Sequence, residues 1–284
     1  MRNPQFSNPA IYISIIIALL LVFFVFIPAF SGKIQINPVI SLGFFQIRWY
    51  GLILAAAILV GYFMARKNSW KFGISPADID DYAFWAVIIG VLGARFYYVI
   101  FNYDYFSRHP GEIYKIWHGG LSIYGAILAS LIFTYFYAQK KAYSFWQLFD
   151  LVALSLPLAQ AIGRFGNFIN QEAFGLPTNL PWKMYVAPMY RPSQFASADF
   201  FHPAFLYEAI VDVLVFAILY RLLGRVKSGV LGLSYLVLYS FGRFFVESIR
   251  LDSFFVSGFR IDQVVAFLLI VSGGFLIFKK QTSS

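Results

Sequence analysis

The sequence predicts an all-α fold, a polytopic membrane helix bundle with about seven core transmembrane helices and an extra N-terminal apolar segment. Hydrophobic residues make up 60% of the 284 positions. Charged residues make up only 12%, against about 25% in soluble domains. Aromatic residues contribute 21%, as expected where many helix ends meet membrane–water interfaces. These observations indicate that a bilayer surrounds most of the chain.

Eight apolar runs are long enough to span about 30 Å of hydrocarbon. They cover residues 11–30, 50–66, 82–101, 119–138, 145–163, 203–223, 230–249 and 262–279. The first run follows Arg2 and ends near Ala29 and Ser31, so a cleavable signal peptide is the alternative to an uncleaved span. Its apolar run is longer than the usual signal-peptide core of about 7–15 residues, which favours the uncleaved span. We therefore expect an N-terminal segment with its outer connection, residues 1–43, and a single functional domain, residues 44–284.

Clusters of lysine and arginine predict the orientation of these runs. The clusters lie between runs two and three, four and five, and six and seven, and after the last run. All four are therefore on one side of the membrane, which the positive-inside rule makes cytoplasmic. The C-terminus then lies in the cytoplasm and the long 164–202 connection lies outside. The net charge of +9 follows from this pattern and favours contact with anionic lipid head groups. We therefore expect no nucleic-acid partner.

Charged residues inside apolar runs are the candidates for a functional site, because each costs about 2.5–3.5 kcal/mol at a helix centre. By the predicted topology most of them lie near outer helix ends, so we expect them to converge. The chain has no cysteine and no HExxH motif, so we expect no metal and no cofactor. The candidates are Arg95, Asp150, Arg164, Glu172, Glu208, Asp212, Arg243 and Glu247.

The most informative string is Gly-Arg-Phe-Gly-Asn-Phe-Ile-Asn-Gln-Glu at residues 163–172. If the helix continues through it, Arg164 and Asn167 share one face, close to Asn170 and Glu172. A guanidinium offers a planar fork of donors that matches two phosphate oxygens. The alternative is an interfacial arginine with an asparagine helix cap. We interpret the string as a phosphate-binding site.

Two further strings carry ionisable side chains. His118 precedes two glycines and a helix start, where backbone N–H groups can bind an anion, and histidine accepts protons near neutral pH. An interfacial histidine beside Trp117 is the alternative. Arg243 and Glu247 are spaced to form a pair one helical turn apart, either as part of the site or as a structural ion pair. Glu208 is expected to orient a neighbouring arginine.

Five strings together resemble the bacterial prolipoprotein diacylglyceryl transferases over residues 44–279. They are RWYG at 48–51, HGGLSIYG at 118–125, GRFGNFINQE at 163–172 with Gly175, HPAFLYE at 202–208 and GRFFVE at 242–247. The resemblance implies transfer of sn-1,2-diacylglyceryl from phosphatidylglycerol to the lipobox cysteine of a prolipoprotein signal peptide. Glycerol-1-phosphate is then released at the outer face of the bacterial cytoplasmic (inner) membrane.

The resemblance also implies roles for individual residues. Arg164 and Arg243 are the catalytic arginines, and His118 is by hypothesis the base that takes the thiol proton. The implied substrate-binding residues are Tyr50, Asn167, Asn170, Glu172, Gly175, Glu208 and Glu247. Departures from the family pattern are the apolar run 11–30, the pair Ala204-Phe205 after the His-Pro motif, and Asp262-Gln263 at the start of the last run.

A lipid or anion transporter is the alternative from another class, since the same arginines would bind a phosphate without chemistry. Transport would favour glycine-interrupted half-helices in two matching halves of the chain, and the sequence shows no such duplication. An intramembrane protease is a third alternative, but the Gly-x-Ser-Gly arrangement is absent. The acyl-chain preference and oligomeric state do not follow from the sequence.

Overall fold

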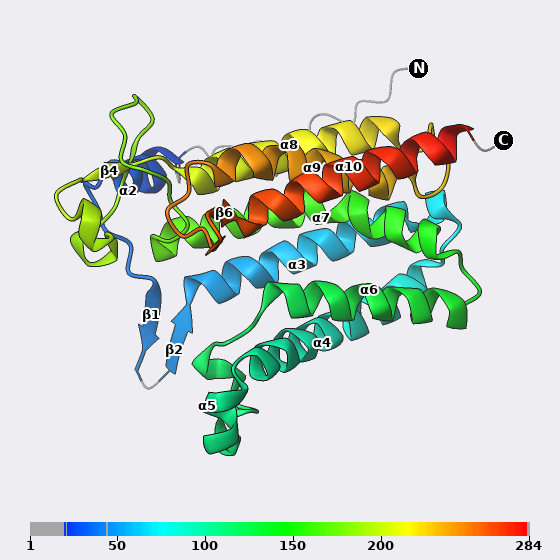
Figure 1. Ribbon diagram of the computed structural model, residues 1–284, viewed down its shortest axis with the longest axis horizontal. Coiled ribbons are helices and arrows are strands. Elements are labelled where there is room, and N and C mark those ends of the chain that lie inside the picture. The colour runs from blue at the N-terminus through cyan, green and yellow to red at the C-terminus, as the bar shows by residue number, and fades with distance from the viewer. Residues whose placement is uncertain (1–19, 21, 44, 283–284) are drawn as a thin grey trace. The chain divides into compact units, whose positions relative to one another are not determined.

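Figure 1 shows the computed structural model, which describes residues 20, 22–43 and 45–282. The chain forms two compact units. The first unit comprises residues 1–56, 161–211 and 241–267. The second comprises residues 57–160, 212–240 and 268–284.

Helices occupy the second to the eighth of the predicted apolar runs. This confirms the predicted multi-pass helical fold. They are α3 (Trp49–Asn68), α4 (Pro76–Phe101), α6 (Ile123–Lys140), α7 (Phe145–Asn170), α8 (Ala204–Leu222), α9 (Val230–Glu247) and α10 (Ile261–Thr282). Among the described residues, five helical stretches are long and apolar enough to cross a membrane, and they contain α3, α4, α7, α9 and α10. Helix α8 has the length to do so but carries Glu208, Asp212 and Arg221.

The predicted N-terminal span at 11–30 falls largely outside the described residues. Its described end forms the π-helix η1 (Val22–Phe26) and α2 (Ile27–Phe30). The rings of Phe26 and Phe168 lie 5.0 Å apart, so this segment packs on the end of α7. The core of the first unit consists of Ala29, Phe168, Phe174, Met184, Val186, Phe201 and Phe205.

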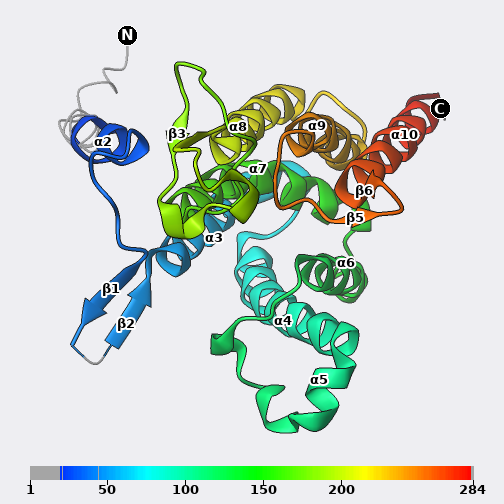
Figure 2. The ribbon, with the colours of Figure 1, turned by 60° about the vertical axis from the view of Figure 1, so that its left-hand side comes forward.

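The described part of the first unit also contains three short two-stranded antiparallel sheets (Figure 2). Strands β1 (Val39–Leu42) and β2 (Phe45–Arg48) pair with Val39 opposite Arg48, and β2 leads directly into α3. Strands β3 (Met184–Tyr185) and β4 (Phe200–Phe201) pair within the connection between α7 and α8, which also contains the 3-10 turns η5 (Pro188–Tyr190) and η6 (Ser193–Phe195). Strands β5 (Phe255–Val256) and β6 (Phe259–Arg260) lead into α10.

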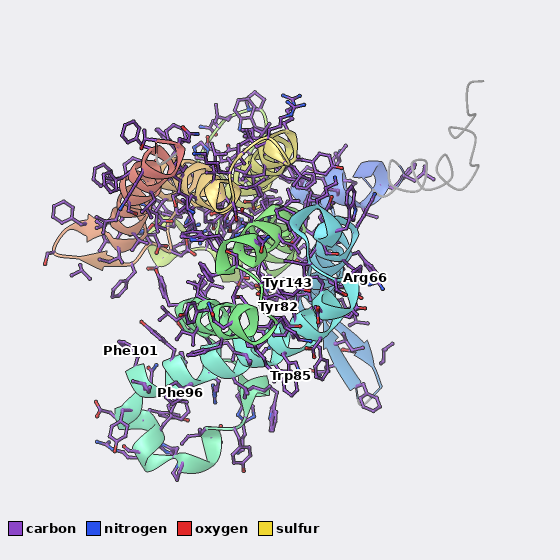
Figure 3. The ribbon with its side chains drawn as sticks, turned by 90° about the vertical axis from the view of Figure 1, so that its right-hand side faces the viewer. Arg66, Tyr82, Trp85, Phe96, Phe101 and Tyr143 are labelled. Atoms are coloured by element: carbon purple, nitrogen blue, oxygen red, sulfur yellow. The ribbon has the colours of Figure 1, made fainter. Side chains whose placement is uncertain are left out.

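In the second unit, α4 and α6 lie side by side (Figures 1 and 2). Their backbones approach closely because two glycines face each other: a methyl group at Gly93 would lie 2.8 Å from the carbonyl oxygen of Gly125. Small residues allow such contacts between membrane helices. Figure 3 marks Trp85, Phe96 and Phe101 along α4, and all three are exposed, as expected for side chains that face lipid.

The connections of the second unit are short helical turns. The 3-10 turn η2 (Ser69–Phe72) follows α3, whereas α5 (Tyr103–Arg108), η3 (Pro110–Glu112) and η4 (Ile116–His118) join α4 to α6. Tyr82 and Thr134 share a buried hydrogen bond of 2.8 Å across α4 and α6. The core around them consists of Ile74, Ile79, Tyr82, Tyr137, Ala138, Leu148 and Leu151.

Candidate active site

Helix α7 continues to Asn170, so Arg164 and Asn167 share a face, as the sequence predicts. Beyond the helix the chain reverses sharply, and Gln171 (φ 49°) adopts a left-handed conformation that non-glycine residues seldom adopt. The side-chain amides of Asn167 and Asn170 both donate to Oε1 of Glu172, at 3.0 and 3.2 Å. The two asparagines therefore fold Glu172 back over the end of α7.

Two glycines of the predicted site allow close packing. A methyl group at Gly166 would lie 2.7 Å from Cδ2 of Tyr50, so only glycine lets the Tyr50 ring lie against α7. A methyl group at Gly175 would lie 2.9 Å from Cβ of His202. The Gly175 N–H donates to the His202 carbonyl at 2.9 Å. Tyr50 and Gly175 therefore help to shape the site.

The carboxylate of Glu208 lies at the centre of a cluster of arginines. Nη1 of Arg164 is 3.1 Å from Oε2 of Glu208. Arg243 and Arg250 both donate through Nη1 to Oε1, the latter at 3.0 Å. Glu208 is only 4% exposed. Three guanidiniums from α7, α9 and the segment after α9 thus meet at one buried carboxylate, and the expectation that Glu208 orients an arginine finds support in these contacts.

Further carboxylates complete the pairing. Nη2 of Arg243 lies 2.7 Å from Oε2 of Glu247 and 2.9 Å from Oδ2 of Asp262, so the predicted one-turn ion pair forms. Arg250 makes two hydrogen bonds with Asp252, at 2.6 and 2.9 Å. Buried charges are tolerated only when they are paired in this way. The arginines are consequently held at fixed positions before any substrate arrives.

Arg250, Asp252 and Asp262 were not predicted from the sequence as site residues. Arg250 and Asp252 lie beyond the end of α9, and Asp262 is on the first turn of α10. The sequence offered one signal, since Arg250 follows Glu247 by three residues. In the structure, Nε of Arg250 lies 3.8 Å from Oε2 of Glu247. The side chains meet because the chain turns back after α9, which no helical period predicts.

His118 belongs to the second unit, where it ends η4. Its Nδ1 lies 2.8 Å from Oε2 of Glu112, and the His118 side chain is 54% exposed. Lys115 donates to the other oxygen of Glu112 at 2.7 Å. The hydrogen bonds from Lys115 and His118 lower the pKa of the Glu112 carboxyl. That His118 converges with the arginines stays a prediction.

Two of the candidate charges have other partners. Buried Arg95 donates to backbone carbonyls, with 2.8 Å to Ile113 and 2.7 Å to Gly119. It therefore holds the loop that carries His118. Asp150 accepts the N–H groups of Gly229 and Gly232 at 2.6 Å each, next to the start of α9. The expectation that these two residues are part of one common site gains no support from their contacts.

Within the described part of the chain, no group of three or more His, Cys, Asp or Glu side chains is arranged to hold a metal ion. What the fold and the site define is a multi-pass membrane protein with a buried, charge-paired arginine cluster. The chain belongs to the prolipoprotein diacylglyceryl transferase family, whose sequence profile matches residues 37–279.

The chain is also similar to curated members of this family. It is 47% identical to the phosphatidylglycerol--prolipoprotein diacylglyceryl transferase of Fervidobacterium nodosum, over 94% of each chain. It is 44% identical to the protein of that name from Thermotoga petrophila, over 91% of this chain and 92% of the relative. The Listeria welshimeri protein is 40% identical over 88% and 92% of the two chains.

Proposed function

We propose that this protein transfers the sn-1,2-diacylglyceryl group of phosphatidylglycerol to the cysteine thiol of a prolipoprotein lipobox and releases glycerol-1-phosphate. The observation that carries this proposal is the meeting of Arg164, Arg243 and Arg250 at Glu208. Guanidiniums suit a phosphate diester because their donors match its oxygens in pairs. The names of the family's curated members support the same substrates.

The reaction requires a thiolate, because a free cysteine thiol with a pKa of about 8.5 is only slightly ionised at neutral pH. A base removes the S–H proton, and His118 is our candidate for it. The sulfur attacks carbon three of the glyceryl group, a C–S bond forms, and the C–O bond to the phosphate breaks. The electron pair of that bond leaves with glycerol-1-phosphate, where Arg164 and Arg243 stabilise the developing charge.

The contacts of Glu208 and Glu247 suit this role of the arginines. A donor that is already positioned needs no reorganisation when charge develops on a leaving group. Glu208 pairs with the guanidiniums of both Arg164 and Arg243, and Glu247 pairs with that of Arg243. Around the end of α7, where we place substrate binding, lie Tyr50, Asn167, Asn170, Glu172 and Gly175.

The proposed location is the bacterial cytoplasmic (inner) membrane, with the site toward the outer face and the C-terminus in the cytoplasm. The basic clusters at helix ends support this orientation through the positive-inside rule. Residues 44–284 are proposed to act as one functional domain, since the family profile extends over residues 37–279.

The test is incubation of the purified protein with phosphatidylglycerol and a lipobox peptide, followed by mass spectrometry. The expected product is a peptide that has gained one diacylglyceryl group on its cysteine, together with glycerol-1-phosphate. Replacing the peptide cysteine with serine should abolish both products. Lipid binding without a thioether product would instead favour a transporter.

A further inference from the structure

A pocket of about 560 Å³ lies beyond the ends of three helices in the first unit. Its walls come from the segment before α3, the end of α7, the connection between α7 and α8, and the segment after α9. Pockets of this volume are large enough for a ligand of several residues. It is lined by Pro38, Val39, Arg48, Asn170, Gln171, Glu172, Ala173, Phe174, Tyr190, Pro192, Leu251 and Asp252.

The lining combines apolar side chains with side chains that carry hydrogen-bond donors and acceptors. Arg48 and Tyr190 offer donors, whereas Glu172 and Asp252 offer acceptors. A phosphate group needs donors and is disfavoured by carboxylates. An extended polypeptide presents both N–H donors and C=O acceptors along its length. The mixed lining therefore suits a peptide backbone with small side chains better than a lipid phosphate.

The backbone at the pocket is strained. Gln171 (φ 49°) and Ala173 (φ 55°), both in the lining, have left-handed conformations. Such conformations are sparsely populated for non-glycine residues and persist where surrounding contacts hold them. One such contact is the hydrogen bond of 2.6 Å from the Ala187 N–H to Oε1 of Gln171. Contacts within the protein thus hold this wall of the pocket in shape.

The position of the pocket decides which part of a prolipoprotein fits. Its lining residues precede α3 or lie at or beyond the last residues of α7 and α9, so the pocket is outside the apolar length of these helices. The apolar part of a signal peptide belongs in the hydrocarbon. The residues after the modified cysteine belong to the exported chain and are in water.

We propose that this pocket binds, as an extended segment, the residues that directly follow the modified cysteine of the prolipoprotein. The inference rests on the proposed function for the identity of the peptide. Asn170 and Glu172 line the pocket and also belong to the string 163–172 that contains Arg164. A peptide bound in the pocket therefore has its thiol near Glu172, next to the arginine site. The pocket then contributes to the choice of prolipoprotein rather than to the chemistry.

Because the chain contains no cysteine, one introduced thiol can report on the occupant. The variants are Val39→Cys, in the pocket wall, and Leu42→Cys, on the same strand but outside the lining. The probe is a lipobox peptide with serine in place of its cysteine and a bromoacetamide group two residues later. The protein thiol displaces bromide and forms a thioether. Leu42 is 59% exposed, so non-specific alkylation favours the control.

The expected result is at least tenfold faster alkylation of Val39→Cys, suppressed by excess unlabelled peptide. Equal or faster alkylation of Leu42→Cys would overturn the proposal. If glycerol-1-phosphate, but not unlabelled peptide, protected the Val39→Cys thiol from alkylation, the proposal would also be overturned. The pocket would then be assigned to the lipid head group. Alkylation needs no turnover, so a peptide that labels Val39→Cys in a protein without transferase activity would contradict the proposed function alone.

A kinetic measurement checks the same inference. Val39→Trp fills the pocket, so the KM for the lipobox peptide should rise about tenfold, equivalent to about 1.4 kcal/mol, while the KM for phosphatidylglycerol stays constant. Leu42→Trp is the matched control and should change neither. An increase in the lipid KM alone would contradict the assignment of the pocket to the peptide.

Discussion

Arg250 donates from Nη1 to Oε1 of Glu208 across 3.0 Å, although the two residues are 42 positions apart in the chain. The same oxygen receives Nη1 of Arg243, and the other oxygen pairs with Arg164. One carboxylate thus sets the spacing of three guanidiniums. We therefore propose that Glu208 positions the three arginines.

Replacing Glu208 with alanine should destabilise the protein and abolish transfer. Removing one member of a buried ion pair costs about 3–5 kcal/mol, because the remaining charges lose their partner. Thermal unfolding in detergent and the transfer assay measure the two effects. Asp104→Asn, at an exposed carboxylate of α5, is the control and should change neither. A Glu208→Ala variant with the native unfolding temperature would contradict the structural role of this carboxylate.

Arg164→Ala and Arg243→Ala should each abolish transfer, since each removes a guanidinium from the proposed phosphate site. Lysine should restore little activity at either position because an ammonium lacks the two-pronged donor geometry. Product is measured by mass spectrometry, and thermal unfolding identifies variants that fail to fold. Near-normal turnover of a folded Arg164→Lys variant would argue against a contact that needs this geometry.

The helices were predictable because apolar runs of bilayer length leave few alternatives. The predicted run 203–223 and the observed helix Ala204–Leu222 differ by one residue at each end. The larger difference is at α7, which was predicted to end at residue 163 and continues to Asn170. Asn167 and Asn170, the polar residues in the last turns, suggest an earlier helix end in the sequence. In the structure their side chains bind Glu172 and the helix continues.

The site was predictable where its residues share one helix and not where loops bring them together. The pair of Arg243 and Glu247 follows from helical spacing. Asp262 joins Arg243 from the start of α10, and Arg250 joins Glu208 after a turn. Arg95 was a candidate because it is a charge within an apolar run, but its hydrogen bonds to loop carbonyls depend on a fold of residues 112–120 that no sequence period indicates.

Orientation can be tested with the same cysteine-free background. Ser193 lies in the long connection between α7 and α8, and Ser228 lies between α8 and α9. By the positive-inside rule, a cysteine at position 193 should react with an impermeant maleimide in intact spheroplasts. A cysteine at position 228 should react only after lysis. The opposite labelling pattern would reverse the proposed orientation.

His202 should make stability depend on pH. Burial lowers its pKa below the ordinary value of 6.5, and its Nδ1 lies 3.1 Å from the Tyr207 hydroxyl. Above pH 6.5 the His202 imidazole is neutral in both the folded and the unfolded state. It then makes no pH-dependent contribution to the free energy of unfolding. As the pH falls below 6.5 the unfolded state is protonated first, so stability decreases until the folded pKa is reached. Unfolding measured across this range should show a smaller decrease for His202→Gln, and an unchanged decrease would assign the effect to other groups.

His118 provides the last prediction, which concerns the proton of the substrate thiol. Its Nδ1 faces Glu112 at 2.8 Å, so a proton there leaves Nε2 as the acceptor. If Nε2 takes the thiol proton, His118→Gln should lower the transfer rate by about 10²–10⁴. Glu112→Gln should lower it less, through the loss of orientation. Raising the pH should recover part of the His118→Gln loss, since more of the peptide thiol is already ionised. The measurement is the ratio of native to variant rates between about pH 6.5 and 9, below and just above the thiol pKa. A constant ratio would exclude His118 as the base and leave the arginines around Glu208 as the centre of the reaction.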